Sequence, residues 1–460
     1  MRIIDLSNRL VAVLGYGLEG QAVANYLIKH GVQPVLFDQR AWADWPKKKQ
    51  AEIKSLGLNF IFGPDAFLEL GGFDLAFRSP GIALSHPDLL KWPSLQITSQ
   101  TKWFFDNCPS KIIGVTGTKG KGTTASLTYE ILNKQYPKSN IQNPNIYLTG
   151  NIGKVQPFDI IDNLKKEDFI VYELSSFQLQ DLDYSPYIGV VLMTTSEHLD
   201  YHENKQEYLK AKESILKYQN PDDMAVINAD FASSVEIGRL GRGKKFYFSV
   251  KGNTADCFVQ AERIVLKSSN GLEPVVGVKE IQIRGRHNWE NVCAAALAAR
   301  IAGCDTNNIR QAVMDFKGLE HRLELVSEKR GIKFYNDSFS TTPETAIAGI
   351  KAFDGPLVVI LGGSKKNSDF ADLGKIIASS KNIKALILIG QEAGRIKGAI
   401  GKAGVTMLEG AENMQEIFKQ IKSLATAGDT VLLSPACASF DMFKNYQDRG
   451  EQFKHFVKAY

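Results

Sequence analysis

The sequence predicts an α/β protein of three domains, and three of its features lead to this prediction. Apolar, strand-like runs at residues 10–14, 111–115 and 357–361 each end in a glycine-rich turn. Strand-like and helical segments alternate after the turns, which is typical of parallel sheets. The length of 460 residues also exceeds that of one ordinary domain. The predicted domains are residues 1–107, 108–319 and 320–460.

Composition excludes several classes of protein. The formal net charge is only +5, and the basic run Lys47–Lys49 has no interleaved aromatic residues, so we expect no nucleic-acid partner. The five cysteines include no CxxC pair and form an odd set, which argues against disulfides and zinc knuckles and favours a reducing cytoplasm. No apolar run approaches the ~18 residues that a membrane span needs. We expect a soluble, cytoplasmic protein without a membrane partner.

The first glycine turn has the form of a nucleotide-binding crossover. Gly15-Tyr-Gly-Leu-Glu-Gly20 follows the first strand-like run, a helical pattern reaches Ile28, and the next strand-like run ends in Asp38. A GxGxxG turn with an acidic residue after the second strand is typical of Rossmann-like domains. Such turns bind dinucleotides, mononucleotides or sugar nucleotides, and some only pack tightly. The residues alone leave these alternatives open.

The second turn, Gly117-Thr-Lys-Gly-Lys121, predicts a site for nucleotide phosphates. Glycines let successive N–H groups point to one place, and the following helix adds the positive end of its dipole. Lys121 supplies a charge for the β- and γ-phosphates. Gly122 stands where the common phosphate loop has a hydroxyl residue, and Thr123 and Thr124 follow it. We therefore predict a central P-loop ATPase domain with a parallel sheet and a displaced Mg²⁺-binding hydroxyl.

The third turn, Gly362-Gly-Ser-Lys-Lys366, opens a further alternation of strands and helices. Residues 383–389 and 430–433 form the next strand-like runs. This pattern predicts a Rossmann-like C-terminal domain.

Side chains in the middle of the chain are candidate ligands of a metal ion. Glu173 ends the strand-like run Phe169–Tyr172, and a carboxylate there suits Mg²⁺ beside a phosphate loop. His198 and His202 are one helical turn apart, a spacing also found in zinc sites, but no HExxH motif or third soft ligand accompanies them. Asn288 precedes an alanine-rich helix and is a candidate N-cap.

The phosphate loop Val115-Thr-Gly-Thr-Lys-Gly-Lys121 resembles that of the Mur ligase superfamily, which makes peptidoglycan precursors and includes folylpolyglutamate synthetases. Further segments match the family in order over nearly the whole chain. They are Gly150-Asn-Ile-Gly153, Glu173-Leu-Ser-Ser-Phe-Gln178, Thr195–His202, Glu207–Ile215, Arg286–Ala296, His321-Arg322, Tyr335–Ser338, Gly362–Phe370 and Leu433–Gly450. The second and the last of these are closest to the branch that adds D-glutamate.

The resemblance implies a role for many individual residues. It implies that Lys121, Glu173, His198 and Lys212 are catalytic. It implies two Mg²⁺ ions held by Thr123, Glu173, His198 and a carbamylated Lys212, although from the residues alone Lys212, like Lys210, is a solvated helix lysine. The implied ATP-binding residues are Gly117, Thr118, Lys119, Gly120, Lys121, Gly122, Thr123, Asn288, Asn291, Arg322 and Asp337. The implied contacts of a UDP-linked substrate are Leu18, Glu19, Asp38, Ser79, Gly81 and Asn151, and those of glutamate are Thr341, Lys366, Ser439, Phe440 and Tyr446.

The activity implied by the resemblance is ATP-dependent addition of D-glutamate to UDP-N-acetylmuramoyl-L-alanine, through an acyl phosphate and a tetrahedral intermediate, by a monomer. Phe339, where many relatives have lysine, and Tyr446, where phenylalanine is common, depart from the family near the implied glutamate site. Addition of L-glutamate and folylpolyglutamate synthesis stay open as alternatives. A catalytically silent regulator is disfavoured by the intact set of site residues, and a dehydrogenase by the phosphate loop.

Overall fold

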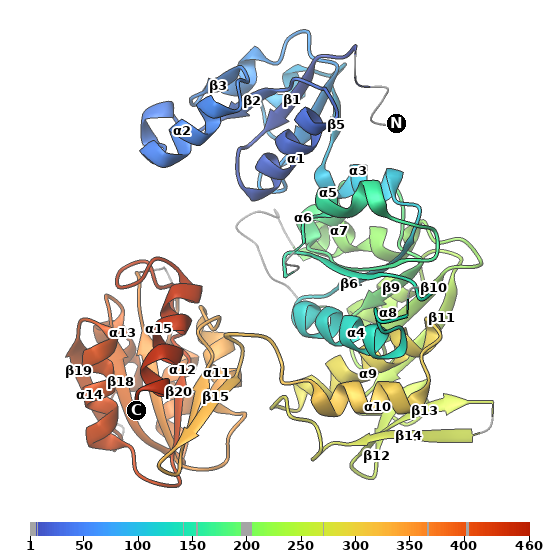
Figure 1. The fold of residues 1–460 in the computed structure, drawn as a ribbon. Helices are drawn as coiled ribbons and strands as arrows, with labels where there is room; N and C mark the ends of the chain where they lie inside the picture. Colours follow the sequence, from blue (N-terminus) through green and yellow to red (C-terminus); the bar gives the residue numbers. More distant parts are fainter. Residues whose placement is uncertain are drawn as a thin grey trace. The chain divides into compact units, whose positions relative to one another are not determined.

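The structure is a computed structural model that describes residues 6, 8–140, 142–152, 155–194, 205–269, 271–365, 368–401 and 404–460. Its contacts divide the chain into two compact units. The first unit comprises Met1–Val276 and Glu290–Ala312, and the second comprises Gly277–Trp289 and Val313–Tyr460. Three parallel or mostly parallel sheets form the framework (Figure 1), which confirms the predicted α/β class. The boundaries predicted at residues 107 and 319 stay a prediction.

The first sheet has the strand order β3-β2-β1-β4-β5, with every neighbouring pair parallel. This is a Rossmann-like arrangement, as predicted from the first glycine turn. Its strands are β1 (Val11–Leu14), β2 (Val35–Asp38), β3 (Phe60–Phe62), β4 (Leu75–Arg78) and β5 (Gln96–Thr98). Its helices are α1 (Leu18–Lys29), α2 (Lys47–Ser55) and α3 (Gln100–Asn107).

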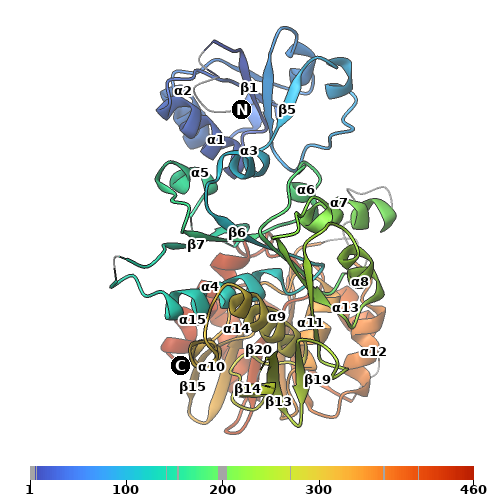
Figure 2. The ribbon, with the colours of Figure 1, turned by 90° about the vertical axis from the view of Figure 1, so that its right-hand side faces the viewer.

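The second sheet has nine strands in the order β14-β13-β12-β11-β10-β9-β6-β8-β7. The strands are β6 (Lys111–Thr116), β7 (Ile146–Gly150), β8 (Phe169–Glu173), β9 (Ile188–Val191), β10 (Met224–Asn228), β11 (Lys244–Ser249), β12 (Cys257–Gln260), β13 (Arg263–Ser268) and β14 (Gly271–Gly277). The helices are α4 (Lys121–Gln135), α5 (Pro157–Ile160), α6 (Ser176–Leu179), α7 (Lys205–Lys217), α8 (Ala232–Gly238), α9 (His287–Ile301) and α10 (Thr306–Asp315). Strands β6 to β12 pair in parallel, and β13 joins β12 antiparallel. Helix α4 lies beside β7 in Figure 2 and packs on β7 and β8. Because it follows β6 after a short loop, its N-terminus lies at the carboxyl edge of this sheet.

One hydrophobic core is common to the first two sheets. It includes Val13 and Phe77 of the first sheet, Trp103 of α3, and Ile170 and Tyr172 of β8. A buried ion pair adds to this core, because Arg78 at the end of β4 donates to both carboxylate oxygens of Asp181 at 2.5 and 2.6 Å. The first unit therefore holds both sheets together by apolar packing and by charge.

The third sheet has the order β15-β16-β20-β17-β18-β19 and is parallel except for the pair β15–β16. The strands are β15 (Glu324–Lys329), β16 (Ile332–Asn336), β17 (Leu357–Gly362), β18 (Ile383–Ile389), β19 (Thr406–Ala411) and β20 (Thr430–Leu433). The helices are α11 (Pro343–Ile350), α12 (Ala371–Ser379), α13 (Ala393–Ile400), α14 (Met414–Leu424) and α15 (Tyr446–Lys458). Successive residues of β17 enter opposite cores: Val358 packs with α14 and α15, and Val359 with α11, α12 and α13. Helices cover both faces, as continuous apolar parallel strands require.

The segment 277–289 belongs to the second unit although it precedes α10 in the sequence. Arg284 Nε donates to the Tyr335 hydroxyl at 2.8 Å, and the guanidinium lies over the rings of Tyr335 and Phe353. Residues that lie outside the sequence of the third sheet thus pack against its side chains.

Among the described helices, none has the combination of length and apolar composition that crossing a membrane requires. All five cysteines are free thiols, and four of them are buried.

Candidate active site

The ends of four parallel strands gather the candidate site at one edge of the second sheet. In the pairing register, Glu173 of β8 lies opposite Val115 of β6 and Gly150 of β7, and Thr116 lies opposite Val191 of β9. Ligands of open α/β sheets bind outside the carboxyl ends of the strands. The register therefore places the glycine loop after β6 and the carboxylate of Glu173 at a position suited to a nucleotide.

The glycine loop depends on backbone conformations that only glycine adopts easily. Gly117 has φ of 156° and Gly120 has φ of 87°, and a Cβ atom at Gly120 would lie 2.2 Å from Asn291 Oδ1. Asn291 also accepts a hydrogen bond from Thr124 Oγ1 at 3.3 Å. The loop therefore rests on α9 through Asn291, and a side chain at position 120 would displace it.

Lys121 is the first residue of α4, and its side chain lies over the loop. Its Nζ donates to the carbonyl oxygens of Gly117 at 3.1 Å and Thr118 at 3.0 Å. Thr118 N in turn donates to Met193 O at 2.8 Å, which ties the loop to the segment after β9. A positive charge at a helix N-terminus beside turned backbone amides is an arrangement that binds phosphate. Among the other loop residues, Lys119 is exposed and Gly122 is buried, and Thr123 is half-buried.

Lys212 of α7 is buried beneath the same loop, with 1% of its surface exposed. Its Nζ donates to Gly117 O at 3.1 Å and to Thr116 Oγ1 at 3.3 Å and lies over the ring of Tyr208. Lys210, two residues earlier, is exposed. The interpretation of Lys212 as a solvated lysine, which the residues alone support, is therefore wrong, and the family resemblance selects the buried lysine.

Glu173 ends β8 as predicted, and it is buried with 5% of its surface exposed. Two of the predicted site residues, His198 and Lys366, lie outside the described residues. Asn288 is buried in the first turn of α9, which begins at His287, so the prediction that Asn288 is the N-cap is wrong. Its Nδ2 instead donates to Arg284 O. Helix ends are the least predictable part of an element, because one residue of fraying or extension changes the cap.

Most of the predicted contacts of the UDP-linked substrate belong to the first sheet and its glycine turn, whereas Asn151 directly follows β7 of the second sheet. The Asp38 carboxylate accepts from the backbone N–H groups of Tyr16 and Arg40, both at 2.8 Å, and Ser79 Oγ donates to Gly15 O at 2.9 Å. These two side chains stabilise the turn itself. Leu18 is 80% exposed, and Gly81 and Asn151 are also exposed.

Glu19 faces inward from this turn. Gln178 Nε2 donates to Glu19 Oε1 at 3.1 Å, and burial raises the pKa of the Glu19 carboxyl to about 7. Gln178 also forms a capping box with Ser175 at the start of α6. The first glycine turn is thereby connected to the segment that follows Glu173.

In the second unit, the predicted site residues lie at the carboxyl ends of β16 and β20. Asp337 accepts from Ser434 Oγ at 2.7 Å and from Leu323 N at 3.1 Å, and burial raises the pKa of its carboxyl to about 7. Arg322 lies 3.9 Å from the ring centroid of Phe339, which meets Tyr446 edge-on at 5.0 Å. Ser439 is buried, Phe440 is 74% exposed and Thr341 is half-buried.

Comparison with known proteins identifies the family. The model of the Mur ligase middle domain matches residues 115–299, that of the Mur ligase glutamate ligase domain matches residues 321–437, and that of the Mur ligase MurD-like N-terminal domain matches residues 9–98. The chain belongs to the Mur ligase family. As a member of this family it is an ATP-dependent ligase that forms a peptide bond.

Curated relatives and solved structures agree with this membership. The chain is 36% identical to UDP-N-acetylmuramoylalanine--D-glutamate ligase of Acetivibrio thermocellus, over 99% of this chain and 97% of the relative. It is 35% identical to the enzyme of the same name from Symbiobacterium thermophilum, over 97% of each. The fold resembles those of MurF from Acinetobacter baumannii (TM-score 0.63, 17% identity, 98% of this chain and 90% of that one) and UDP-N-acetylmuramate-alanine ligase from Thermotoga maritima (0.61, 16%, 98% and 100%). These two structures confirm the Mur ligase fold.

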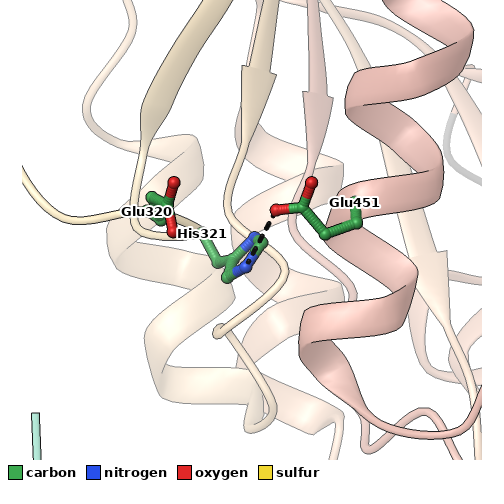
Figure 3. A group of neighbouring side chains, drawn as sticks. All are labelled: Glu320, His321 and Glu451. Atoms are coloured by element: carbon green, nitrogen blue, oxygen red, sulfur yellow. Dashed lines mark ion pairs between the residues drawn. The ribbon is translucent and has the colours of Figure 1, made fainter. Parts of the chain in front are cut away.

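A further cluster of this Mur ligase, formed by Glu320, His321 and Glu451, brings its possible ligand atoms within 4.8 Å of one another (Figure 3). Lys454 Nζ lies 2.6 Å from Glu451 Oε1 and 3.5 Å from Glu320 Oε1. Burial, followed by the charge of Lys454, lowers the pKa of His321. Because the Lys454 ammonium group already pairs with both carboxylates, we interpret the cluster as an ion-pair network and not as a metal site.

Two buried arginines were missed by the sequence analysis. Arg78 forms the ion pair with Asp181, and Arg449 of α15 is completely buried and donates to Ser338, Cys437 and Ala438. Arginine is rarely buried without partners, and nothing in the local sequence marks either residue as buried. Arg449 lies within the matched segment Leu433–Gly450 and Arg78 directly precedes Ser79, which are the features of the sequence that point to them.

Proposed function

We propose that this chain joins D-glutamate to UDP-N-acetylmuramoyl-L-alanine with ATP, in cytoplasmic synthesis of peptidoglycan precursors, and acts as a monomer. The names of the curated relatives, which match nearly the whole chain, support this choice of substrates. The observation that carries the proposal is the arrangement at the edge of the second sheet, where Lys121 and Lys212 both contact Gly117 O beside the strand that Glu173 ends.

The first step activates a carboxylate whose own oxygen is a poor leaving group. A carboxylate oxygen of the UDP-linked acceptor attacks the γ-phosphorus of ATP, the bond to the bridging oxygen breaks, and ADP leaves with the bonding electrons. Lys121 and the amides of the loop at 117–122 stabilise the charge that develops on the transferred phosphoryl group. The product is an acyl phosphate.

The second step forms the peptide bond. The amine of glutamate attacks the acyl carbon and gives a tetrahedral intermediate, which collapses with loss of inorganic phosphate and of a proton from nitrogen. Thr341, Lys366, Ser439, Phe440 and Tyr446 orient the glutamate in this proposal. Holding amine and acyl phosphate together contributes a large part of the catalysis, on the order of 7–11 kcal/mol for well-oriented groups.

The Mur ligase family uses ATP with Mg²⁺, and the donors in this chain fit that ion. Mg²⁺ prefers oxygen ligands, and Glu173 and Thr123 offer a carboxylate and a hydroxyl next to the loop. We propose that two ions are held by Thr123, Glu173, His198 and a carbamate on Lys212. When bound, they would neutralise the triphosphate and the charge transferred with it. The Lys212 carbamate would form by addition of its neutral amine to CO₂ with loss of a proton, which turns a cation into an anionic oxygen ligand.

The remaining predicted residues bind the substrates. Asn288, Asn291, Arg322 and Asp337 contact ATP together with the loop residues, and the turn after β1 holds the uridine diphosphate group. The structure supports one refinement for Asp38, which acts by holding that turn because both oxygens of its carboxylate accept backbone N–H groups, while Glu19 connects the turn to Gln178 through Oε1.

A phosphate-release assay with D- and L-glutamate side by side tests the proposal. We expect release that depends on ATP, on UDP-N-acetylmuramoyl-L-alanine and on D-glutamate, with chiral analysis of the product. Faster turnover with L-glutamate than with D-glutamate would identify L-glutamate as the amino-acid substrate. Turnover with a folate acceptor would identify a folate, and not the UDP-linked compound, as the acceptor. A folded sample that consumes no ATP with any of these combinations would refute the proposal.

A further inference from the structure

Arg449 is a buried cation near the N-terminus of a helix, and burial disfavours its charge. It lies in the first turn of α15, after the N-cap Asn445, so its charge is near the positive end of the helix dipole. The side chain is completely buried, and within the described part of the chain no carboxylate forms an ion pair with it. Burial lowers the pKa of the guanidinium to about 10, so it stays protonated at neutral pH.

Backbone and hydroxyl oxygens surround this guanidinium on several sides. Nε donates to Ser338 Oγ at 2.9 Å, Nη2 donates to Ser338 O at 2.9 Å and to Cys437 O at 3.1 Å, and Nη1 donates to Ala438 O at 3.4 Å. Ser338 Oγ extends the hydrogen-bond network by donating to Tyr446 O at 2.8 Å. A planar fork with five donors is needed for this set, and lysine does not supply it.

The oxygens that Arg449 binds come from segments carrying most of the proposed glutamate contacts. Ser338 precedes the turn with Thr341, and Cys437 and Ala438 precede Ser439 and Phe440. Ala438 O also accepts from Ser364 N at 2.9 Å, in the glycine turn that leads to Lys366. Gly363 fits there only because it has no side chain, since a Cβ would lie 2.1 Å from Ala438 O.

Binding two successive carbonyls also fixes the direction of two amides. In a trans peptide the N–H points opposite to the carbonyl of the same unit. The N–H groups of Ala438 and Ser439 therefore point away from Arg449, and successive amides that face one side attract anions.

We propose that Arg449 is a positioning residue for the amino-acid substrate, which sets the backbone at 437–439 and the turn at 338–341 so that an anionic amino acid is bound. This inference rests on the proposed function and deepens it. Arg449 contacts the protein and not the substrate, so its loss changes binding of the amino acid more than binding of the nucleotide or the acceptor.

Steady-state kinetics of Arg449→Lys test the proposal, with Arg330→Lys as the matched control. Arg330 lies in an exposed turn of the same unit, so the control makes the same chemical change away from the network. We expect Arg449→Lys to raise the KM for glutamate roughly tenfold or more, with the KM values for ATP and the UDP-linked acceptor within about twofold, because charge-assisted hydrogen bonds are lost. The control should match the unmodified protein in all three values.

A second variant covers the case in which Arg449→Lys does not fold. Ser338→Ala removes the acceptor of the Nε hydrogen bond but keeps the guanidinium. We expect a smaller rise in the KM for glutamate, with the KM values for the other two substrates unchanged. An unchanged KM for glutamate in the folded variants, or an equal rise for all three substrates, would overturn the positioning role. Absence of glutamate-dependent turnover in the unmodified protein would instead refute the proposed function.

Discussion

Single side chains at the candidate site are distinguished by their surroundings more than by their type. Lys210 and Lys212 have the same chemistry and lie two residues apart, but α7 exposes the first and buries the second beside Gly117 and Thr116. Helix geometry turns side chains two positions apart to different faces. Only a comparison of whole segments, and not the local pattern, selects the lysine that reaches the loop.

Replacement of Lys121 by alanine should remove the charge that we propose stabilises the transferred phosphoryl group. We expect the rate of ATP-dependent phosphate release to fall by roughly 100- to 1000-fold, with the thermal unfolding temperature little changed. Lys134→Ala, at the exposed far end of the same helix, is the control and should keep full activity. Near-normal turnover by a folded Lys121→Ala protein would contradict the assignment of the loop.

Asp337 should make part of the stability depend on pH. The pKa of its carboxyl is raised by burial from 3.8 to about 7, so between these values the folded chain retains a proton that the unfolded chain has released. The contribution of this group to the unfolding free energy is therefore greatest below about pH 4 and declines as the pH rises through 7. Asp337→Asn should flatten this decline, which calorimetry at pH 5 and pH 8 measures. Equal pH dependence in both proteins would contradict it.

At the scale of elements, the end of β4 is connected to the segment after α6 by a buried ion pair. Arg78→Met leaves the Asp181 carboxylate buried without its partner, and we expect the unfolding free energy to fall by about 3–5 kcal/mol in denaturant titrations. The double variant Arg78→Met/Asp181→Leu should recover much of that loss, since no isolated charge remains. If the double variant were as unstable as the single one, packing and not charge would dominate this connection.

The N-terminus of α4 depends on Gly120, which has a positive φ and lies against Asn291. Gly120→Ala should cost more than about 1 kcal/mol of stability and should weaken ATP binding, measured by calorimetric titration. Gly252→Ala is a suitable control, because a Cβ there meets only Ser249 Oγ at 3.5 Å. Unchanged ATP affinity in Gly120→Ala would show that the loop tolerates this shift.

The sequence predicts the helices and strands at the site better than it predicts the burial and contacts of their side chains. Apolar runs followed by glycine identify β1, β6 and β17, because burial on both faces of a parallel sheet leaves a local pattern. The strand-end position of Glu173 follows from the same pattern. The burial of Lys212, Arg449 and Asp337 depends on segments distant in sequence that pack around them. The local sequence pattern around each residue does not indicate which distant segments these are.

At the scale of the whole molecule, the thiols offer a probe of folding. Burial raises the pKa of Cys108 to about 11 and those of Cys304 and Cys437 to about 12, and it also raises the pKa of Cys293. The thiolate is the reactive form. We expect the folded chain to react far more slowly with an alkylating reagent at pH 8 than the chain in denaturant, as followed by intact mass. Rapid modification of Cys293, Cys304 or Cys437 in the native protein would contradict the burial of these residues.

The chain passes between its two compact units three times, at residues 276/277, 289/290 and 312/313. Neither unit is therefore a continuous stretch that a simple truncation would isolate. A recombinant fragment beginning at residue 320 would lack Arg284 and leave the faces of Tyr335 and Phe353 bare. A genetic dissection of this enzyme therefore has to join residues 277–289 to a fragment that begins at residue 313.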